Sequence, residues 1–195
     1  MAQIEKPHRH FRMFKPYGYL SQFQSNARHE RNKKFLGELH DFPEGTMAIG
    51  RLDKNSEGLL LLTTDGKVSH EICSSSYEKE YYVQVDGLLT RQSFSDLKRG
   101  ITIVSKGKSF TSSVISVKPL SKAPNFPKRG KSIRDARHGP TSWISITINE
   151  GKFHQVRKMT AAVGLPTLRL VRVRVGSILL DGLSYGEVEE LESVV

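Results

Sequence analysis

The segment from residue 47 to residue 66 constrains the fold more than any other part of the chain. Residues 47–52 are mostly apolar, residues 53–58 are polar and end in glycine, and a run of four leucines at 59–62 precedes Thr63-Thr64-Asp65-Gly66. Short apolar runs bounded by turn residues are typical of strands, and an Asp-Gly pair is a turn signal. The segment therefore predicts a short strand, a polar turn, a buried strand and a second turn.

Asp53 stands at the beginning of the polar turn. Aspartates in turns commonly accept hydrogen bonds from nearby backbone N–H groups, so a turn or capping role is the ordinary interpretation. A carboxylate held between two strands is also well placed for nucleophilic or proton-transfer chemistry. Asp53 is therefore the first candidate for a catalytic residue.

The composition indicates a globular chain without disulfides or a membrane span. With 195 residues, 37% of them hydrophobic, it can bury one core or two small subdomains that share a sheet. The four leucines are the longest apolar run, so we expect no transmembrane helix. The single cysteine, Cys73, excludes an internal disulfide and fits a reducing compartment, and we expect a buried or half-buried thiol. Without a secretory signal near the first strand, we expect a cytoplasmic protein, and a monomer.

Positive charge points to a polyanionic partner. The net charge is +10, and the last fifteen residues carry five acidic and no basic side chains, so residues 1–180 carry a formal +15. Residues 118–142 are basic, aperiodic and rich in proline and glycine, as long functional loops often are. They hold seven cations: Lys118, Lys122, Lys128, Arg129, Lys131, Arg134 and Arg137. Such clustering favours nucleic acid over an ordinary solvated surface.

Periodicity predicts an α+β fold with a mixed, mostly antiparallel sheet. Alternation and β-branched content place strands at 11–16, 47–52, 59–64, 80–86, 110–117, 143–148 and 168–175. Helices are expected at 32–39, 67–73, 92–99 and 155–163. The chain contains no CxxC, HExxH, GxGxxG or Walker-type pattern, so we expect neither a metal nor a nucleotide cofactor.

Four stretches carry a resemblance to a known family. They are residues 14–23 (FKPYGYLSQF), 50–66 (GRLDKNSEGLLLLTTDG), 79–87 (KEYYVQVDG) and 150–170 (EGKFHQVRKMTAAVGLPTLRL). In this order they resemble the KPxG turn, the aspartate signature, the K-x-Y segment and the EGRxxQVRRM motif of the RsuA/RluB/E/F branch of RNA pseudouridine synthases. The resemblance implies an α+β catalytic domain whose two subdomains share a mixed sheet, with a basic cleft between them. Because the KPxG stretch lies near the N-terminus, we expect one catalytic domain over residues 1–195, without an N-terminal S4 domain, most similar to RluE-type members.

The resemblance also implies roles in the chemistry. Asp53 takes the place of the catalytic carboxylate, Tyr81 that of the active-site tyrosine, and Arg157 that of the cation that pairs with the carboxylate. Tyr81 begins an alternation with Val83 and Val85, so its ring is expected to face the core. The ordinary interpretations are a core tyrosine for Tyr81 and a surface helix arginine for Arg157.

Further residues are predicted to bind the substrate RNA. Arg51 resembles the arginine that fills the stack when the target uridine is extruded, and His154 and Gln155 either contact RNA or cap a helix. Arg172 and Arg174 alternate with valines, which predicts an exposed strand face that contacts phosphates or only water. The whole predicted set is Arg51, Leu52, Lys79, His154, Gln155, Lys128, Arg129, Lys131, Arg134, Arg172 and Arg174.

The sequence thus predicts an isomerase that converts a specific uridine of large-subunit (23S) ribosomal RNA to pseudouridine. Within the family, small-subunit rRNA or tRNA is the alternative substrate. A non-catalytic RNA-binding or ribosome-assembly protein is a second alternative. A carboxylate-dependent ribonuclease would need another acid near Asp53, and the two candidates, Glu57 and Asp65, both read as turn residues.

Overall fold

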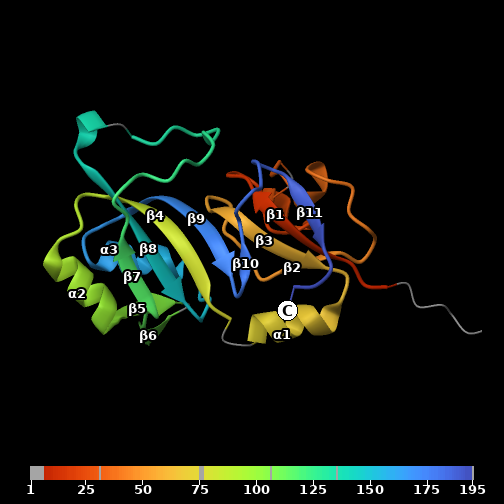
Figure 1. Cartoon of the computed structure of the whole chain (residues 1–195), viewed down its shortest axis with the longest axis horizontal. Coiled ribbons are helices and arrows are strands. Elements are labelled where there is room, and N and C mark those ends of the chain that lie inside the picture. The colour runs from red at the N-terminus through yellow and green to blue at the C-terminus, as the bar shows by residue number, and fades with distance from the viewer. Residues whose placement is uncertain (1–6, 31, 75–76, 106, 135, 195) are drawn as a thin grey trace, which may run out of the picture.

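A computed structural model describes residues 7–30, 32–74, 77–105, 107–134 and 136–194 (Figure 1). Its main sheet has the strand order β11 (Val188–Leu191), β1 (His10–Lys15), β3 (Glu57–Thr63), β9 (Thr167–Val175), β4 (Lys79–Asp86), β8 (Thr141–Ile148) and β7 (Ser116–Pro119), with β2 (Met47–Ile49) beside β3 and β10 (Ile178–Leu179) beside β9. Strands β5 (Ile101–Ser105) and β6 (Lys108–Ser112) form a separate hairpin. The pairing of β3 with β9 is parallel, and the other pairings of the main sheet are antiparallel. The predicted α+β fold with a mixed, mostly antiparallel sheet is confirmed.

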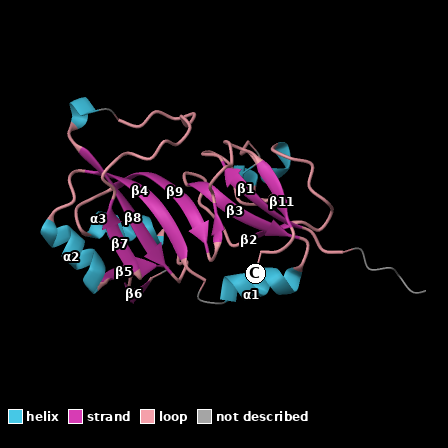
Figure 2. Ribbon diagram, viewed as in Figure 1, coloured by secondary structure: helices cyan, strands magenta, loops and turns pink. Residues whose placement is uncertain are grey.

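The α-helices of the described residues pack against this sheet or the hairpin (Figure 2): they are α1 (Gly66–Ser74), α2 (Arg91–Arg99) and α3 (Gln155–Ala162). Helix α1 lies against β2 and β3, α2 against β7, and α3 against β5 and β9. Within the described ranges, no helix combines the length and the apolar character needed to cross a membrane.

The sheet has two halves that meet at the parallel pair. Figure 1 shows β1, β2, β3, β11 and α1 on one side and β4, β7, β8, α2 and α3 on the other. The β3–β9 ladder consists of only two residue pairs, Glu57 with Val171 and Gly58 with Arg172. Gly58 has a φ of +106°, and a Cβ atom there would lie 2.2 Å from the backbone oxygen of Arg172. Glycine is therefore required at the point where the two halves join.

Both faces of the sheet are covered, and this explains the run of four leucines. Leu60 and Leu62 belong to one hydrophobic core, and Leu59 and Leu61 belong to the core on the opposite face. A strand buried on both faces reads as a continuous apolar run, as the sequence shows. Tyr81 also faces the first core with Val83 and Val85, as its alternation predicted.

Several local predictions are wrong for identifiable reasons. The helix expected at 32–39 is reduced to a 3-10 turn at Leu36–Glu38, because the backbone N–H of Leu36 bonds the carbonyl of Gln22 and Lys34 bridges to Tyr19. The strand expected at 110–117 is two strands, β6 and β7, and β2 ends at residue 49 instead of 52. The short strands β5, β10 and β11 were not predicted, since tertiary pairing rather than local pattern defines them.

Glu57 was predicted to be a turn residue, and this is also wrong. Its side chain is fully buried in β3 and accepts hydrogen bonds from Arg169 Nη2 at 2.7 Å and Nε at 3.0 Å. This bidentate pair crosses from β9 to β3, so it reinforces the short parallel junction. Asp65, also predicted to be a turn residue, precedes α1, and its Oδ1 accepts from the backbone N–H of Lys67 in the first turn of that helix.

Candidate active site

The turn that carries Asp53 is fixed by its backbone. The carbonyl of Asp53 accepts from Ser56 N at 2.9 Å, and the carbonyl of Lys54 accepts from Gly18 N at 2.8 Å. The hydroxyl of Ser21 accepts from Leu52 N at 2.9 Å and donates to Leu52 O at 2.7 Å. Since backbone groups make these bonds, the Asp53 carboxylate is left available for chemistry on a rigid turn.

Two residues at the start of α3 face the Asp53 carboxylate. His154 Nε2 lies 3.4 Å from Oδ1, and Arg157 Nε lies 3.9 Å from Oδ2. Arg157 Nη2 also donates to Asn55 O at 2.8 Å and to the Ser56 hydroxyl at 3.2 Å. Burial lowers the pKa of Arg157 and the Asp53 carboxylate raises it, but a guanidinium stays charged in either case. The structure thus brings Asp53 and Arg157 together across the two halves of the sheet, as predicted.

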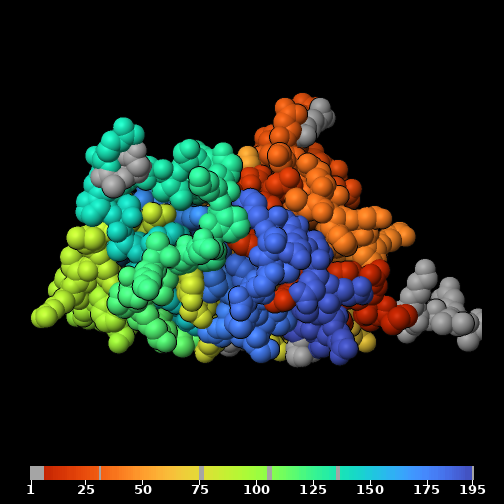
Figure 3. Space-filling view, turned by 45° about the horizontal axis from the view of Figure 1, so that its top comes forward, coloured from red at the N-terminus to blue at the C-terminus, as the bar shows by residue number. Residues whose placement is uncertain are grey.

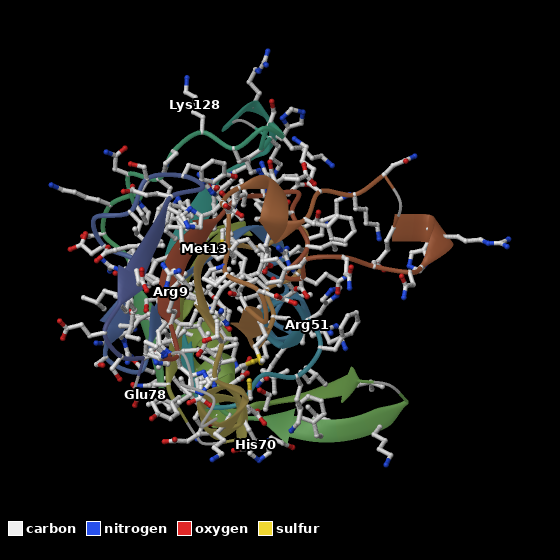
Figure 4. All side chains as sticks on the ribbon, turned by 90° about the vertical axis from the view of Figure 1, so that its right-hand side faces the viewer. Arg9, Met13, Arg51, His70, Glu78 and Lys128 are labelled. Carbon is white, nitrogen blue, oxygen red and sulfur yellow. The ribbon has the colours of Figure 1, made fainter. Side chains whose placement is uncertain are left out.

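A cavity of about 470 Å³ opens beside these side chains. Polar groups of Asp53, Arg51 and His154 lie on its wall, and its apolar lining comes from Leu52, Tyr81, Ile148, Val156 and Leu170. A second cavity shares Arg51, Tyr81, Gly151 and Lys152 with the first, so the two form one cleft. Figure 4 shows Arg51 between the N-terminal segments and the β5–β6 hairpin.

Tyr81 lies where the two cavities meet. Its ring is 8% exposed, packs in the core beneath the cleft and lines both cavities. Its cross-strand neighbour on β9 is Arg172. A half-apolar cleft with a carboxylate, a guanidinium and a phenol suits a planar polar ring flanked by a sugar.

Comparison with known proteins decides the family. A family model described as RNA pseudouridylate synthase matches residues 10–162. The chain is 40% identical over 172 residues to ribosomal large subunit pseudouridine synthase E of Xanthomonas axonopodis pv. citri, covering 87% of each chain, and 37% identical over 180 residues to the Vibrio parahaemolyticus protein of that name, covering 91% of this chain and 71% of the relative. The chain belongs to the RNA pseudouridylate synthase family.

A solved structure with a similar fold agrees with this family assignment. The structure described as crystal structure of pseudouridylate synthase superposes with a TM-score of 0.71 at 26% identity, covering 98% of this chain and 73% of the other. The reaction of an RNA pseudouridine synthase is the isomerisation of uridine to pseudouridine. The cleft at Asp53 is the site in this synthase whose residues suit that reaction.

Lys15, in the KPxG stretch of the synthase, was not predicted to matter for the site. It is fully buried, and its Nζ donates to Pro16 O at 2.9 Å and to Tyr19 O at 2.8 Å. Burial lowers the pKa of Lys15 to about 7, with Glu57 and Asp53 opposing the shift. The KPxG pattern was a usable signal, because Lys15 holds the turn against which Asp53 is anchored.

The Lys15 shift predicts a pH-dependent stability. Its pKa is lower in the folded state than in the unfolded state, so the unfolded state binds more protons between pH 7 and about 10.4. The free energy of unfolding should therefore rise through this window by up to about 1.4 kcal/mol per pH unit. Urea unfolding of the wild type and Lys15→Met from pH 6 to 10 measures the difference, with the exposed Lys67→Met as control. A constant difference between wild type and Lys15→Met would contradict the prediction.

Two of the residues predicted to contact RNA are buried. Arg172 is 4% exposed, so the exposed strand face predicted for it is wrong; its Nε donates to Leu59 O at 2.8 Å, across the β3–β9 junction. Gln155 is also buried, and its Nε2 donates to the Ser112 hydroxyl at 2.5 Å and to Glu150 Oε1 at 2.7 Å. Both side chains therefore hold the synthase together beneath or beside the cleft.

Lys79 and Arg174 occupy different surfaces. Lys79 lines the second cavity and donates to Tyr77 O at 2.8 Å, and burial, with nearby Arg172, lowers its pKa. Arg174 is half-buried and pairs with Glu78 at 2.9 Å and Glu80 at 3.1 Å. It lines a cavity that contains none of the residues around Asp53. Lys79 therefore lies where its predicted RNA contact requires it, whereas the charge of Arg174 is already paired.

The basic loop divides into fixed and exposed cations. Arg129 lies over the Tyr17 ring, 4.7 Å from its centroid, and Arg134 pairs with Asp86. Lys128 and Lys131 are exposed, and Figure 4 shows Lys128 extending into solvent. The loop, green to teal in Figure 3, and the orange N-terminal segments form two projections on one face of the synthase.

In the part of the chain that the structure describes, no group of three or more His, Cys, Asp or Glu side chains is arranged to hold a metal ion. Cys73 is exposed at the end of α1, so the expected buried or half-buried thiol is wrong. It lines the second cavity near Lys79.

Proposed function

We propose that this synthase isomerises a specific uridine of large-subunit ribosomal RNA and that Asp53 is its catalytic carboxylate. The observation that carries the proposal is that Asp53 and Tyr81 line one cleft and that Arg157 Nε lies 3.9 Å from the Asp53 carboxylate. The name of the relative that is 40% identical over most of both chains supports the large subunit as the source of the substrate.

The reaction breaks the N1–C1′ bond, turns the uracil and joins C5 to C1′. It changes no oxidation state, and a proton must leave C5 after the new bond forms. Attack of the carboxylate on the sugar, attack on the base, and a glycal route each use a negatively charged Asp53 beside the target nucleoside. All three routes require the uridine to leave its stack and enter the cleft.

Each residue of the cleft takes a role that its contacts support. Arg157 holds the Asp53 turn through Asn55 O and supplies positive charge to the carboxylate. Tyr81 forms the apolar wall against which the uracil packs, with its hydroxyl available for proton transfer. Arg51, exposed at the mouth of the cleft, replaces the extruded base in the RNA stack.

The surface charge supports structured RNA as the partner. Residues 1–180 carry a formal +15, and Lys128 and Lys131 extend from the exposed loop. Such contacts to phosphates give affinity without sequence preference. We further propose that the synthase acts as a monomer in the cytoplasm, where ribosomal RNA is its substrate.

Mapping of pseudouridine in ribosomal RNA tests the substrate. RNA from cells with and without the gene is compared at single-nucleotide resolution, and purified synthase is then added to the unmodified RNA. Loss of one site in large-subunit rRNA, restored by the wild-type protein, supports the proposal. Loss of a site in small-subunit rRNA or tRNA, or no loss at all, would refute the large-subunit assignment.

Replacement of Tyr81 with phenylalanine tests whether the Tyr81 hydroxyl transfers a proton or the ring only lines the cleft. The ring still packs in the core, so the melting temperature should stay close to that of the wild type. If the hydroxyl moves a proton, single-turnover rates should fall by roughly 10²-fold or more. A matched control is Tyr82→Phe, on the opposite face of β4. A Tyr81→Phe rate within a few-fold of wild type would show that Tyr81 is only part of the wall.

Replacement of Lys128 and Lys131 with alanine tests the exposed loop. If each contacts one phosphate, the slope of log K against log[salt] should flatten by about 1.5, because each contact contributes roughly 0.7–0.9. Target and non-target RNA should be affected alike. Titrations at four salt concentrations, with the exposed Lys67→Ala as control, measure the slopes. Parallel slopes for wild type and variant would mean that the loop is an ordinary solvated surface.

A further inference from the structure

Phe153 is exposed at the mouth of the cleft, which is unusual for a phenylalanine. It is 58% exposed, and among the large apolar side chains that are exposed in the described ranges it is the one aromatic. It also lines the cavity that contains Asp53. A large apolar ring left in water beside a catalytic carboxylate indicates a surface that another molecule covers.

The ring is exposed on a rigid backbone. Gln155 Oε1 accepts from Lys152 N at 2.9 Å, and the Gln155 side chain is itself anchored by Ser112 and Glu150. His154 has φ +54° and ψ +29°, a left-handed conformation that a non-glycine residue adopts only when its surroundings hold it there. The exposure of Phe153 is therefore built into the turn that leads into α3.

The same turn stacks two rings. The Phe153 and His154 rings lie 3.8 Å apart with an interplanar angle of 18°, and His154 Nε2 is 3.4 Å from Asp53. The His154 ring thus contacts both the Phe153 ring and the Asp53 carboxylate. A flat group that stacks on Phe153 would lie close to the nucleoside on which Asp53 acts.

The charges around the ring indicate which flat group this is. Lys158 Nζ lies over the ring as a cation–π contact, 5.2 Å from its centroid, and donates to Val104 O, and Arg51 and Lys152 line the cleft beside it. An aromatic ring among cations, on the wall of the cavity that contains Asp53, matches a base attached to a phosphate backbone. The target uracil itself belongs deeper, against Tyr81.

We propose that Phe153, supported by His154, is a stacking platform for an unpaired base next to the target uridine. The proposal rests on the proposed RNA substrate and narrows it: the target lies in a loop, bulge or opened pair whose neighbouring base can leave its own stack. The platform selects substrates in which that base is free.

A double-mutant cycle, in which binding is measured for changes in the protein, in the RNA and in both, tests the platform. The RNA is a fragment that contains the mapped uridine, made intact and with an abasic site at the 5′ or the 3′ neighbour. Phe153→Leu keeps apolar bulk but removes the ring, Phe153→Trp keeps a ring, and Leu88→Ala changes a side chain of similar exposure (59%) outside the cleft. Thermal melting confirms that each variant is folded.

Phe153→Leu should raise the Kd for the intact fragment by roughly 5- to 100-fold. Phe153→Trp and Leu88→Ala should raise it by no more than about 3-fold. One of the two abasic fragments should weaken wild-type binding to the same extent and show no further loss with Phe153→Leu. Additive losses at both neighbours, or a Phe153→Leu Kd within about 2-fold of wild type, would overturn the platform. If mapping assigns the target uridine to another RNA, the large-subunit proposal fails. The same binding measurements are then made on a fragment of that RNA, and they test the stacking platform independently of the large-subunit proposal.

Discussion

Asp53→Asn is expected to abolish pseudouridine formation while the fold and the RNA affinity stay nearly unchanged. Asparagine keeps the shape of the side chain and removes the negative charge that every route to pseudouridine uses. Arg157 should stay in place, because Asn55 O and the Ser56 hydroxyl also hold its guanidinium. The single-turnover rate should fall by at least about 10⁴-fold, the scale seen when a catalytic carboxylate is removed.

The measurement is release of C5 tritium or direct detection of pseudouridine on the cognate RNA under single-turnover conditions. Asp41→Asn, an exposed aspartate outside the cleft, is the control and should retain full activity. Binding of the Asp53→Asn variant to the same RNA, measured in parallel, separates chemistry from affinity. Turnover by Asp53→Asn above background would remove Asp53 from the catalytic role.

Local patterns predicted the parts of the fold that local physics governs. The alternation of Tyr81, Val83 and Val85 reports one buried face of a strand, and the structure confirms it. The helix expected at 155–163 is likewise found as α3, and Arg157 in its first turn reaches Asp53. The family resemblance supplied the roles, because spacing alone leaves Asp53 as an ordinary turn residue.

The failures concern charged residues whose surroundings come from distant segments. Arg172 alternates with valines as a surface arginine would, but its side chain is buried at the β3–β9 junction, where its Nε donates to Leu59 O. Glu57 follows a polar turn, and only its distant partner Arg169 explains why it is buried. Lys15 differs in part, because the carbonyls that accept its hydrogen bonds, Pro16 O and Tyr19 O, lie in the adjacent turn; only its pairing with Gly58 of β3 comes from a distant segment. All three lie near the β3–β9 junction, which no single segment of the sequence describes.

The junction also determines where the active site forms. Asp53 belongs to the half built on β1 and β3, whereas Tyr81 and Arg157 belong to the half built on β4, β8 and α3. The distance between the carboxylate and its partners is therefore set by how β3 meets β9. Since that ladder has only two residue pairs, a small change in it should affect both stability and catalysis.

Gly58→Ala is the substitution that acts on this ladder directly. The new Cβ would lie 2.2 Å from Arg172 O and 2.6 Å from Arg172 N, both backbone atoms that cannot rotate away, at a φ of +106°. Overlap and backbone strain together should lower the free energy of unfolding by roughly 3 kcal/mol or more. Gly45→Ala is the matched control, because Gly45 has a φ of +81° and a Cβ added there would meet no atom within 4 Å, and its cost should be about 1 kcal/mol. Urea unfolding measures both, and the folded fraction of Gly58→Ala should also lose activity as the two halves shift. Equal losses of stability in the two variants would mean that backbone strain alone, and not the close contact of β3 with β9, requires glycine at position 58.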